Sequence, residues 1–249
     1  MAGVCGSLAG MGGGFIMIPL MTSTKLLHLP QHAAHGTSLF AVATTGLAGA
    51  LGYQGQVDYQ AAACIALSGM VTARAGALAT ARLSGVDLRK ALGAFMLAVA
   101  PLVPAKQYLV KQNEERIRTK DDVATASSPS WIQKYVIPLG IGSCSGFLAG
   151  MFGVGGGAVV VPALSVLTDM NHYQALGTSL TAMVLPALSG TVTHFSQGNV
   201  VMRVAPFLAT GAFLGSYAGS KLALSIDEEP LKYGFSVVMV VLGLQALLR

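Results

Sequence analysis

The sequence predicts an all-α membrane protein with about eight transmembrane segments, built as two duplicated four-segment halves that contain Gly-broken helices. Hydrophobic residues make up 53% of the 249 residues and charged residues only 10%, whereas soluble domains carry about 25% charged residues. Glycine is also abundant, at 31 residues, and it is more frequent in membrane helices than in soluble ones. Similar stretches of sequence recur in the same order in both parts of the chain, which indicates the duplication.

A bilayer span needs roughly 20 mainly apolar residues. The chain offers such segments at about 2–22, 34–54, 60–82, 88–105, 135–168, 174–195, 203–225 and 231–248. The fifth is too long for one straight helix, so we expect it to break at its glycines, and the first to break likewise. No basic segment precedes the first span, so we expect no cleavable signal peptide. A chain that opens directly into a span has the form expected of a fragment or a short gene model.

A polar stretch of mixed charge at 106–134 divides the chain. Because it lacks an apolar face, we expect a solvated linker that acts as a passive tether. The first transmembrane repeat is then 1–105, and the second is 135–249.

The duplication is clearest around the glycine-rich stretches. The first half contains LAGMGGGFIMIP (8–19), and the second contains LAGMFGVGGGAVVVP (148–162). The LAGM letters are 140 residues apart and the GGG letters 143 apart, so the first loop is expected to lack three residues. A GTSL sequence follows at 36–39 and at 177–180. Four spans per half is an even number, so the halves should share an orientation, with the loops after the third and seventh spans on the cytoplasmic side.

Consecutive glycines interrupt apolar sequence at matching places in the two halves. They weaken a helix by about 1 kcal/mol each relative to Ala, so we expect broken helices. A half-helix that starts at such a break presents free N–H groups and a positive dipole end to an anion. The candidate substrate-binding glycines are Gly12, Gly13, Gly14, Gly155, Gly156 and Gly157.

The alternative role for these glycines is helix packing, since G-x-x-x-G occurs at Gly146/Gly150 and elsewhere. If Gly156 lies in a substrate site, Gly156→Val should abolish transport, whereas Gly150→Ala, at a packing position, should be milder.

Polar side chains in the spans supply further candidates. The hydroxyls of the two GTSL sequences can cap a helix or donate to an anion; they belong to Thr37, Ser38, Thr178 and Ser179. Arg74 lies in the third span, where it could counter an anion or extend to the membrane interface. His35 and His194, near span ends, could relay protons or lie at the interface.

The two glycine motifs, AGMGGGFIMIP and AGMFGVGGGAVVVP, are each followed by a GTSL helix. This pair resembles the sulfite exporter TauE/SafE family, also called the toluene-sulfonate uptake permease family, and the resemblance covers both halves. It implies a multi-pass transporter of sulfite, sulfonates or related small anions. It also favours a place for the GTSL residues close to the transport path.

The expected function is therefore secondary transport of a small anion across a lipid bilayer. An anion channel and a non-transporting scaffold or receptor are the alternatives. No nucleotide-binding, metal or cofactor motif is evident, and Cys5, Cys64 and Cys144 have neither disulfide nor metal-site spacing. No basic run interleaved with aromatics suggests nucleic acid, and no G-x-S-G motif suggests an intramembrane protease. The oligomeric state is left open.

Overall fold

The computed structural model describes residues 1–23, 29–101, 131–168 and 170–248. Over these ranges the chain forms helices and turns and no strand, which confirms the predicted all-α class. Most of the expected linker at 106–134 lies outside the described residues. Its last residues, from Trp131, already belong to the next helix.

The part of the chain before the linker follows the predicted spans closely. Its described helices are α1 (Ala2–Leu8), α2 (Gly14–Ser23), α3 (Gln31–Gly52), α4 (Tyr59–Thr80) and α5 (Gly85–Val99). The first predicted span is broken between α1 and α2, as expected from its glycines.

After the linker, a π-helical turn leads into a second series. The described elements are η1 (Ile132–Val136), α7 (Ile137–Phe152), α8 (Gly157–Leu167), α9 (His172–Ala182), α10 (Val184–Ser196), α11 (Ala205–Ala223) and α12 (Glu228–Leu248). The fifth predicted span is broken between α7 and α8. The sixth is interrupted at Met183, between α9 and α10.

Polar residues fix the starts of several helices, because the first N–H groups of a helix lack partners within it. The Asp58 carboxylate accepts from the N–H groups of Gln60 and Ala61 at the start of α4. Ser84 caps α5, and Asn171 forms a capping box at the start of α9. These caps explain why the helices begin within a few residues of the predicted boundaries.

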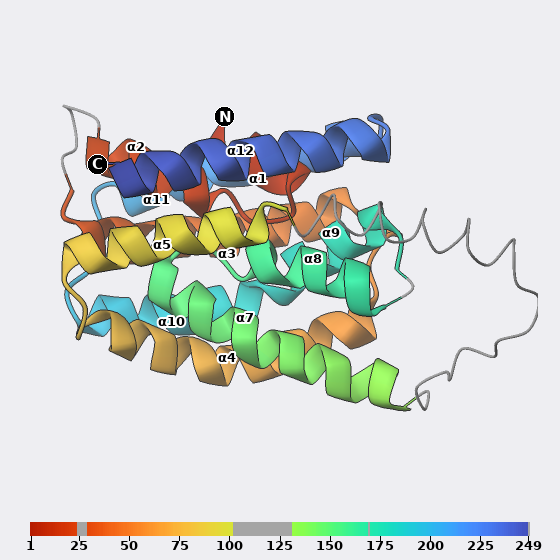
Figure 1. Ribbon diagram of the computed structural model, residues 1–249, viewed down its shortest axis with the longest axis horizontal. Helices are drawn as coiled ribbons and strands as arrows, with labels where there is room; N and C mark the ends of the chain where they lie inside the picture. The colour runs from red at the N-terminus through yellow and green to blue at the C-terminus, as the bar shows by residue number, and fades with distance from the viewer. Residues whose placement is uncertain (24–28, 102–130, 169, 249) are drawn as a thin grey trace, which may run out of the picture.

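The helices lie side by side along the long axis of the molecule (Figure 1). Helix α4 packs in parallel against α7, with Gly146 against Gly69 and Gly150 against Ala73. Helix α1 packs in parallel against α11 through equally close backbone contacts. Small residues permit these approaches, as they do in membrane helix pairs. Helices α5 and α12 pair in the opposite sense.

Each glycine break reverses the direction of the chain. The Thr45 hydroxyl of α3 donates to the Gly12 carbonyl just before α2, and Gln31 at the start of α3 lies in one pocket with Thr22 near the end of α2. Helix α2 is therefore antiparallel to α3. Helix α8 likewise turns back from α7 (Figure 1). Each broken segment is thus a hairpin rather than a single crossing.

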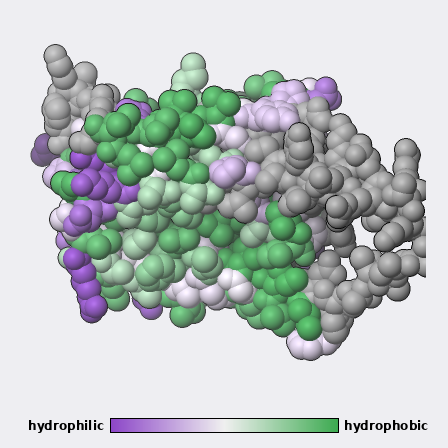
Figure 2. Space-filling view, in the orientation of Figure 1, coloured by the Kyte–Doolittle hydropathy of each residue, from purple (hydrophilic) through white to green (hydrophobic). Residues whose placement is uncertain are grey.

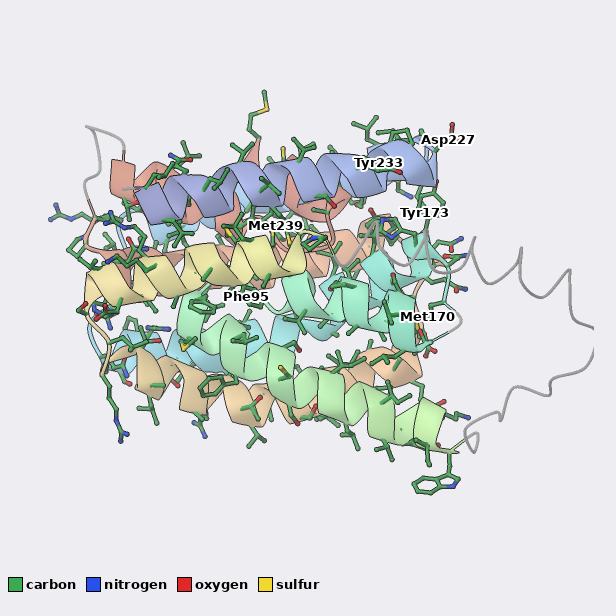
Figure 3. All side chains as sticks on the ribbon, in the orientation of Figure 1. Phe95, Met170, Tyr173, Asp227, Tyr233 and Met239 are labelled. Carbon is green, nitrogen blue, oxygen red and sulfur yellow. The ribbon has the colours of Figure 1, made fainter. Side chains whose placement is uncertain are left out.

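The expectation that the two halves share an orientation is wrong. Helix α3 runs parallel to α11, since the Thr44 hydroxyl reaches Ala209 and Ser216 reaches Thr45. Helix α4, which returns antiparallel to α3, therefore runs opposite to α11. The loops that follow α4 and α11 lie at opposite ends of the molecule, and Figure 3 labels Asp227 in the second loop. The expectation counted each broken segment as one membrane crossing. Because each broken segment turns back on itself, four segments per half do not amount to four crossings.

Three helical stretches among the described residues are long and apolar enough to cross a membrane: Tyr59–Thr80, Lys134–Phe152 and His172–Ser196. Apolar side chains stay exposed on the outer faces. Leu67, Val71 and Leu78 line one face of α4 and are more than half exposed. Figure 2 shows apolar surface over the middle of the molecule and hydrophilic residues gathered at its left end. This distribution suits a body surrounded by lipid.

The interior contains a core at the glycine breaks and a second layer formed by α2, α5 and α12. Phe15 and Ile18 of α2 are buried in one cluster with Leu92 of α5 and Met239 of α12. Figure 3 shows Met239 between α12 and α5. This layer holds one side of α2 in place, and the other side packs on α3.

Candidate functional site

Two buried glycine loops lie at the centre of the candidate site. Gly10 and Gly12 have φ angles of 67° and 78°, and Gly153 and Gly155 have φ angles of 64° and 87°. An L side chain rarely adopts such angles, so glycine is required at these four positions and at Gly13, whose φ is 75°. In each loop the chain ends one helix and soon starts another: α1 ends at Leu8 and α2 begins at Gly14, and α7 ends at Phe152 and α8 begins at Gly157. The predicted broken helices are thus present, and the sequence located them correctly.

The two breaks contact each other reciprocally. Gly14, the first residue of α2, lies against Gly153 and Val154: an added Cβ would meet the Gly153 oxygen at 2.7 Å. Gly157, the first residue of α8, lies against Gly10 and against Met11, whose Cα would be 2.7 Å from an added Cβ. The structure therefore brings the two predicted glycine clusters together, and each half-helix begins on the loop of the other.

The first N–H groups of the two half-helices are donors without acceptors. Ile16 is the first residue of α2 whose N–H bonds back into the loop, at 3.1 Å from the Gly13 oxygen, and Val159 does the same in α8 at 3.0 Å from Gly156. No described residue accepts a hydrogen bond from the N–H of Gly14 or Phe15. A helix start of this kind carries a partial positive charge, and two of them meet here.

Each serine of the two GTSL sequences bonds to the glycine break in the other part of the chain. Ser38 Oγ donates to the Gly153 oxygen at 2.7 Å, and Ser179 Oγ donates to the Gly10 oxygen at 2.9 Å. Both serines are fully buried. Each hydroxyl proton is thus directed at the break on the other side of the pair. The structure brings both serines to the glycine breaks, and it shows that their hydroxyl donors are occupied, which the sequence did not indicate.

The threonines of the same sequences hold the segments that precede two long helices. Thr37 Oγ1 accepts from the N–H of Val201, and Thr178 Oγ1 accepts from the N–H of Asp58, each at 3.0 Å. Neighbouring glycines allow this approach, because an added Cβ on Gly36 would meet the Asn199 backbone. Thr37 and Thr178 each lie one residue before a serine of the same sequence and are also buried. Their hydroxyls bond to the segments before α11 and α4 rather than to the glycine breaks.

Other buried side chains satisfy carbonyls at the end of α7, where a helix leaves its last carbonyls without partners. His194 Nε2 donates to the Gly150 oxygen at 2.9 Å, and Thr80 donates to the Met151 oxygen at 3.0 Å. His35 Nδ1 lies 3.4 Å from the same Met151 oxygen. These histidines are buried rather than interfacial. Both are candidates from the sequence, but the sequence does not connect them to the break.

On the other side of the pair, Tyr53 satisfies a carbonyl near the end of α1, and Thr45 satisfies one in the loop between α1 and α2. Tyr53 Oη donates to the Ser7 oxygen at 3.0 Å, and Thr45 donates to the Gly12 oxygen at 2.8 Å. Neither residue is among the candidates predicted from the sequence. A buried tyrosine needs a hydrogen-bond partner. The position of Tyr53 directly after an apolar helix is the sequence feature that could have marked it as a candidate.

Arg74 lies away from the glycine breaks. It is on the exposed side of α4, between Val71 and Leu78 on the apolar outer face. This position fits the alternative in which the Arg74 side chain extends to the membrane interface. The structure does not bring the Arg74 guanidinium to the other candidate residues.

The space around Gly150 is tighter than the space around Gly156. An added Cβ on Gly150 would meet the Ala73 backbone, with the Ala73 carbonyl carbon at 2.8 Å. On Gly156, which has an ordinary φ of −72°, the nearest atoms belong to Ser145, at 3.1 Å. Gly150 is therefore the less tolerant position, because backbone cannot move aside as a side chain can. An alanine at Gly150 would therefore strain the contact between α4 and α7, and the expected order of transport losses for Gly156→Val and Gly150→Ala stays a prediction.

Comparison with known proteins adds the family. Residues 1–246 match the sulfite exporter TauE/SafE family. The chain belongs to that family. It is 28% identical to "Probable membrane transporter protein YunE" of Bacillus subtilis, over 98% of this chain and 93% of that protein. A probable membrane transporter protein of Methanocaldococcus jannaschii is 25% identical over 99% of this chain and 91% of its own. No solved structure matches the chain.

Membership of the TauE/SafE family, with apolar helices exposed on the outside, makes this chain an integral, multi-pass membrane protein. Its full-length relatives are named as membrane transporters, so the chain is a membrane transporter with a small-molecule substrate. Nothing in these names indicates catalysis.

Proposed function

We propose that this TauE/SafE-family transporter is a secondary carrier of small anions, with sulfite, sulfonates or related sulfur oxyanions as its substrates. The observation that carries the proposal is the reciprocal meeting of two half-helix starts, Gly14 on the Gly153 loop and Gly157 on the Gly10 loop. Two positive dipole ends and unpaired N–H groups at one buried place favour an anion. The description of the family as sulfite exporters supports the choice of substrate.

We also propose that the two halves, 1–105 and 135–249, are an inverted duplication joined by the linker at 106–134. Six of the seven described glycines with positive φ support this: Gly10, Gly12 and Gly55 recur as Gly153, Gly155 and Gly198, each 143 residues later, whereas Gly13 has no such counterpart. Gly10 and Gly12 of the first loop both match residues 143 positions later. This constant spacing argues against the expectation that the first glycine loop lacks three residues. Inverted repeats are frequent in secondary transporters, and their substrate sites lie where discontinuous helices from both repeats meet.

The anion is bound mainly by backbone donors in this proposal. The N–H groups of Gly14 and Phe15 have no acceptor in the described residues, whereas Ser38 and Ser179 already donate to carbonyls. Gly12, Gly13, Gly155, Gly156 and Gly157 then shape the loops, and Thr37 and Thr178 brace the helices around them. Unpaired N–H groups replace the water of an anion without burying a formal charge beside it.

The buried state of the site agrees with alternating access. All glycines of both loops are buried, and the fully buried side chains of Met11 and Phe15 fill the space beside them. An anion reaches such a site only when the two halves move relative to each other, as in rocking transporters. A channel would need a path that stays open.

Proteoliposomes containing the purified protein test this proposal. We expect sulfite or sulfonate uptake that saturates with concentration and that another sulfur oxyanion inhibits. Non-saturating anion current would identify a channel instead. Absence of protein-dependent flux for sulfite, sulfate and sulfonates would favour the scaffold or receptor alternative.

A further inference from the structure

A second polar feature lies outside the glycine breaks, at the end of the molecule where α2 ends and α3 begins. A pocket of about 130 Å³ opens between α2, α3, α5 and α12. Its polar lining comes from Thr22, Gln31, Arg89 and Gln245. Ligand sites for drug-sized molecules occupy roughly 300–1,000 Å³, so this pocket has room for a small ion rather than a large organic molecule.

Arg89 gives the pocket its charge. Its Nε atom is buried and has no hydrogen-bond partner in the described residues, and no acidic side chain lines the pocket. A buried N–H donor without a partner is costly, and a guanidinium forms its strongest hydrogen bonds with oxyanions, two at a time. The neighbouring residue Lys90 is exposed on the same helix and does not line the pocket.

The other polar groups match an anion as well. Gln31 and Gln245 each carry a carboxamide with two N–H donors. Thr22 donates to the Ile18 oxygen at 3.0 Å, within its own helix. The described lining of the pocket therefore combines a guanidinium that has one unpartnered N–H, two carboxamide groups and no acidic side chain.

A line of hydrogen bonds connects this pocket with the second glycine break. Gln31 Nε2 lies 3.0 Å from His35 Nε2, and His35 Nδ1 lies 3.4 Å from the Met151 oxygen. Because an amide nitrogen only donates and a carbonyl only accepts, His35 accepts from Gln31 and donates to Met151. The His35 backbone also contacts Gly153 directly. A change at Gln31 is thus only one side chain from the break.

We propose that the Arg89 pocket is an outer binding site for the transported oxyanion, occupied on its way to or from the glycine breaks. This inference rests on the proposed transport of anions. It assigns Arg89 to substrate binding and Gln31 to a positioning role through His35. An anionic lipid headgroup presents the same oxyanion chemistry, so the test must separate the two sources. The alternative role for Arg89 is structural, as a positive charge near the C-terminal dipole of α2. That role predicts less folded protein or a lower maximal rate in Arg89→Gln, not a higher KM.

The test compares Arg89→Gln, Arg89→Lys and the matched control Lys90→Gln in proteoliposomes, with sulfite as the transported anion. A charge-assisted hydrogen bond lost from the pocket should raise KM by about 10- to 100-fold, with the maximal rate within about twofold. We expect Arg89→Lys to recover part of the affinity, and Lys90→Gln to match the wild type. The same KM change must appear in purely zwitterionic lipid and in lipid containing phosphatidylglycerol.

Three outcomes would overturn the inference. Arg89→Gln and Lys90→Gln could behave alike. Arg89→Gln could reduce only folded protein or maximal rate, which is the structural role. The KM change could require the anionic lipid. If wild-type protein moves no anion, the proposed function fails, and sulfite-dependent thermal stabilisation decides the pocket separately. That stabilisation should be present in wild type and Lys90→Gln and absent in Arg89→Gln.

Discussion

Ser38 donates its hydroxyl proton to the Gly153 carbonyl at 2.7 Å, across 115 residues of sequence. Ser179 makes the reciprocal bond to Gly10 at 2.9 Å. Each bond therefore holds one glycine break against a GTSL helix, the Gly153 break against α3 and the Gly10 break against α9. The serine hydroxyls of the GTSL sequences are suited to donate to an anion, but here they donate to backbone carbonyls of the glycine breaks.

Removal of either serine hydroxyl should destabilise the protein. Ser38→Ala or Ser179→Ala leaves a buried carbonyl without its donor, which costs about 1–3 kcal/mol. We expect a lower unfolding temperature in detergent for both variants, and a similar loss for each. Ser143→Ala is the control, because Ser143 is exposed and bonds only within its helix. A Ser38→Ala protein as stable as this control would show that the bond contributes nothing.

The opposite directions of α4 and α11 predict the sidedness of two loops. Single cysteines at Gly85 and Asp227, in a background without Cys5, Cys64 and Cys144, should react with an impermeant maleimide from opposite sides of the membrane. The reason is that each glycine break turns the chain back, so equivalent helices run in opposite directions. Labelling of both cysteines from the same side would contradict the inverted arrangement.

Packing between α4 and α7 should depend strongly on Gly150. Gly150→Ala would place a Cβ against the Ala73 backbone, and overpacking of this kind costs about 1–3 kcal/mol. Gly140→Ala on the same helix is the control, since nothing lies within 4 Å of its added Cβ and Ala improves helix propensity by about 1 kcal/mol. Thermal unfolding should show a clear loss for the first variant only. Equal stability of both would mean that the helices separate easily here.

Sequence patterns predicted the helices and their breaks because both depend on local chemistry. Apolar length set the spans, and the glycine runs at 12–14 and 155–157 marked where the helices stop. The direction of the halves depends on how the chain leaves each break, which the letters alone do not specify. Counting each broken segment as one crossing therefore gave the wrong orientation.

The candidate site was predicted in part. The glycine loops and the GTSL residues do lie together, since Ser38 bonds to Gly153 and Ser179 bonds to Gly10. The roles of the side chains depend on which carbonyl each hydroxyl reaches, and Ser38 reaches one 115 residues away. Tyr53, Thr45 and Arg89 carry no motif. Their importance comes from burial and from partners, which are properties of the packed structure.

The central claim is that the glycine breaks form the anion site, and sulfite flux through Gly155→Ala tests it most directly. Gly155 has a φ of 87°, and an added Cβ would lie 2.8 Å from Val42 Cγ1. Gly198→Ala is the matched control, since Gly198 has a φ of 74° but nothing within 4 Å of its added Cβ. Both variants carry a strain of about 1–2 kcal/mol from the backbone angle, and only the first alters a break.

Flux is compared at equal amounts of monodisperse protein in proteoliposomes. We expect Gly155→Ala to lose at least about tenfold in saturable sulfite flux, equivalent to about 1.4 kcal/mol, and Gly198→Ala to stay within about twofold of the wild type. Equal flux through the two variants would contradict the account and place the anion path away from the glycine breaks.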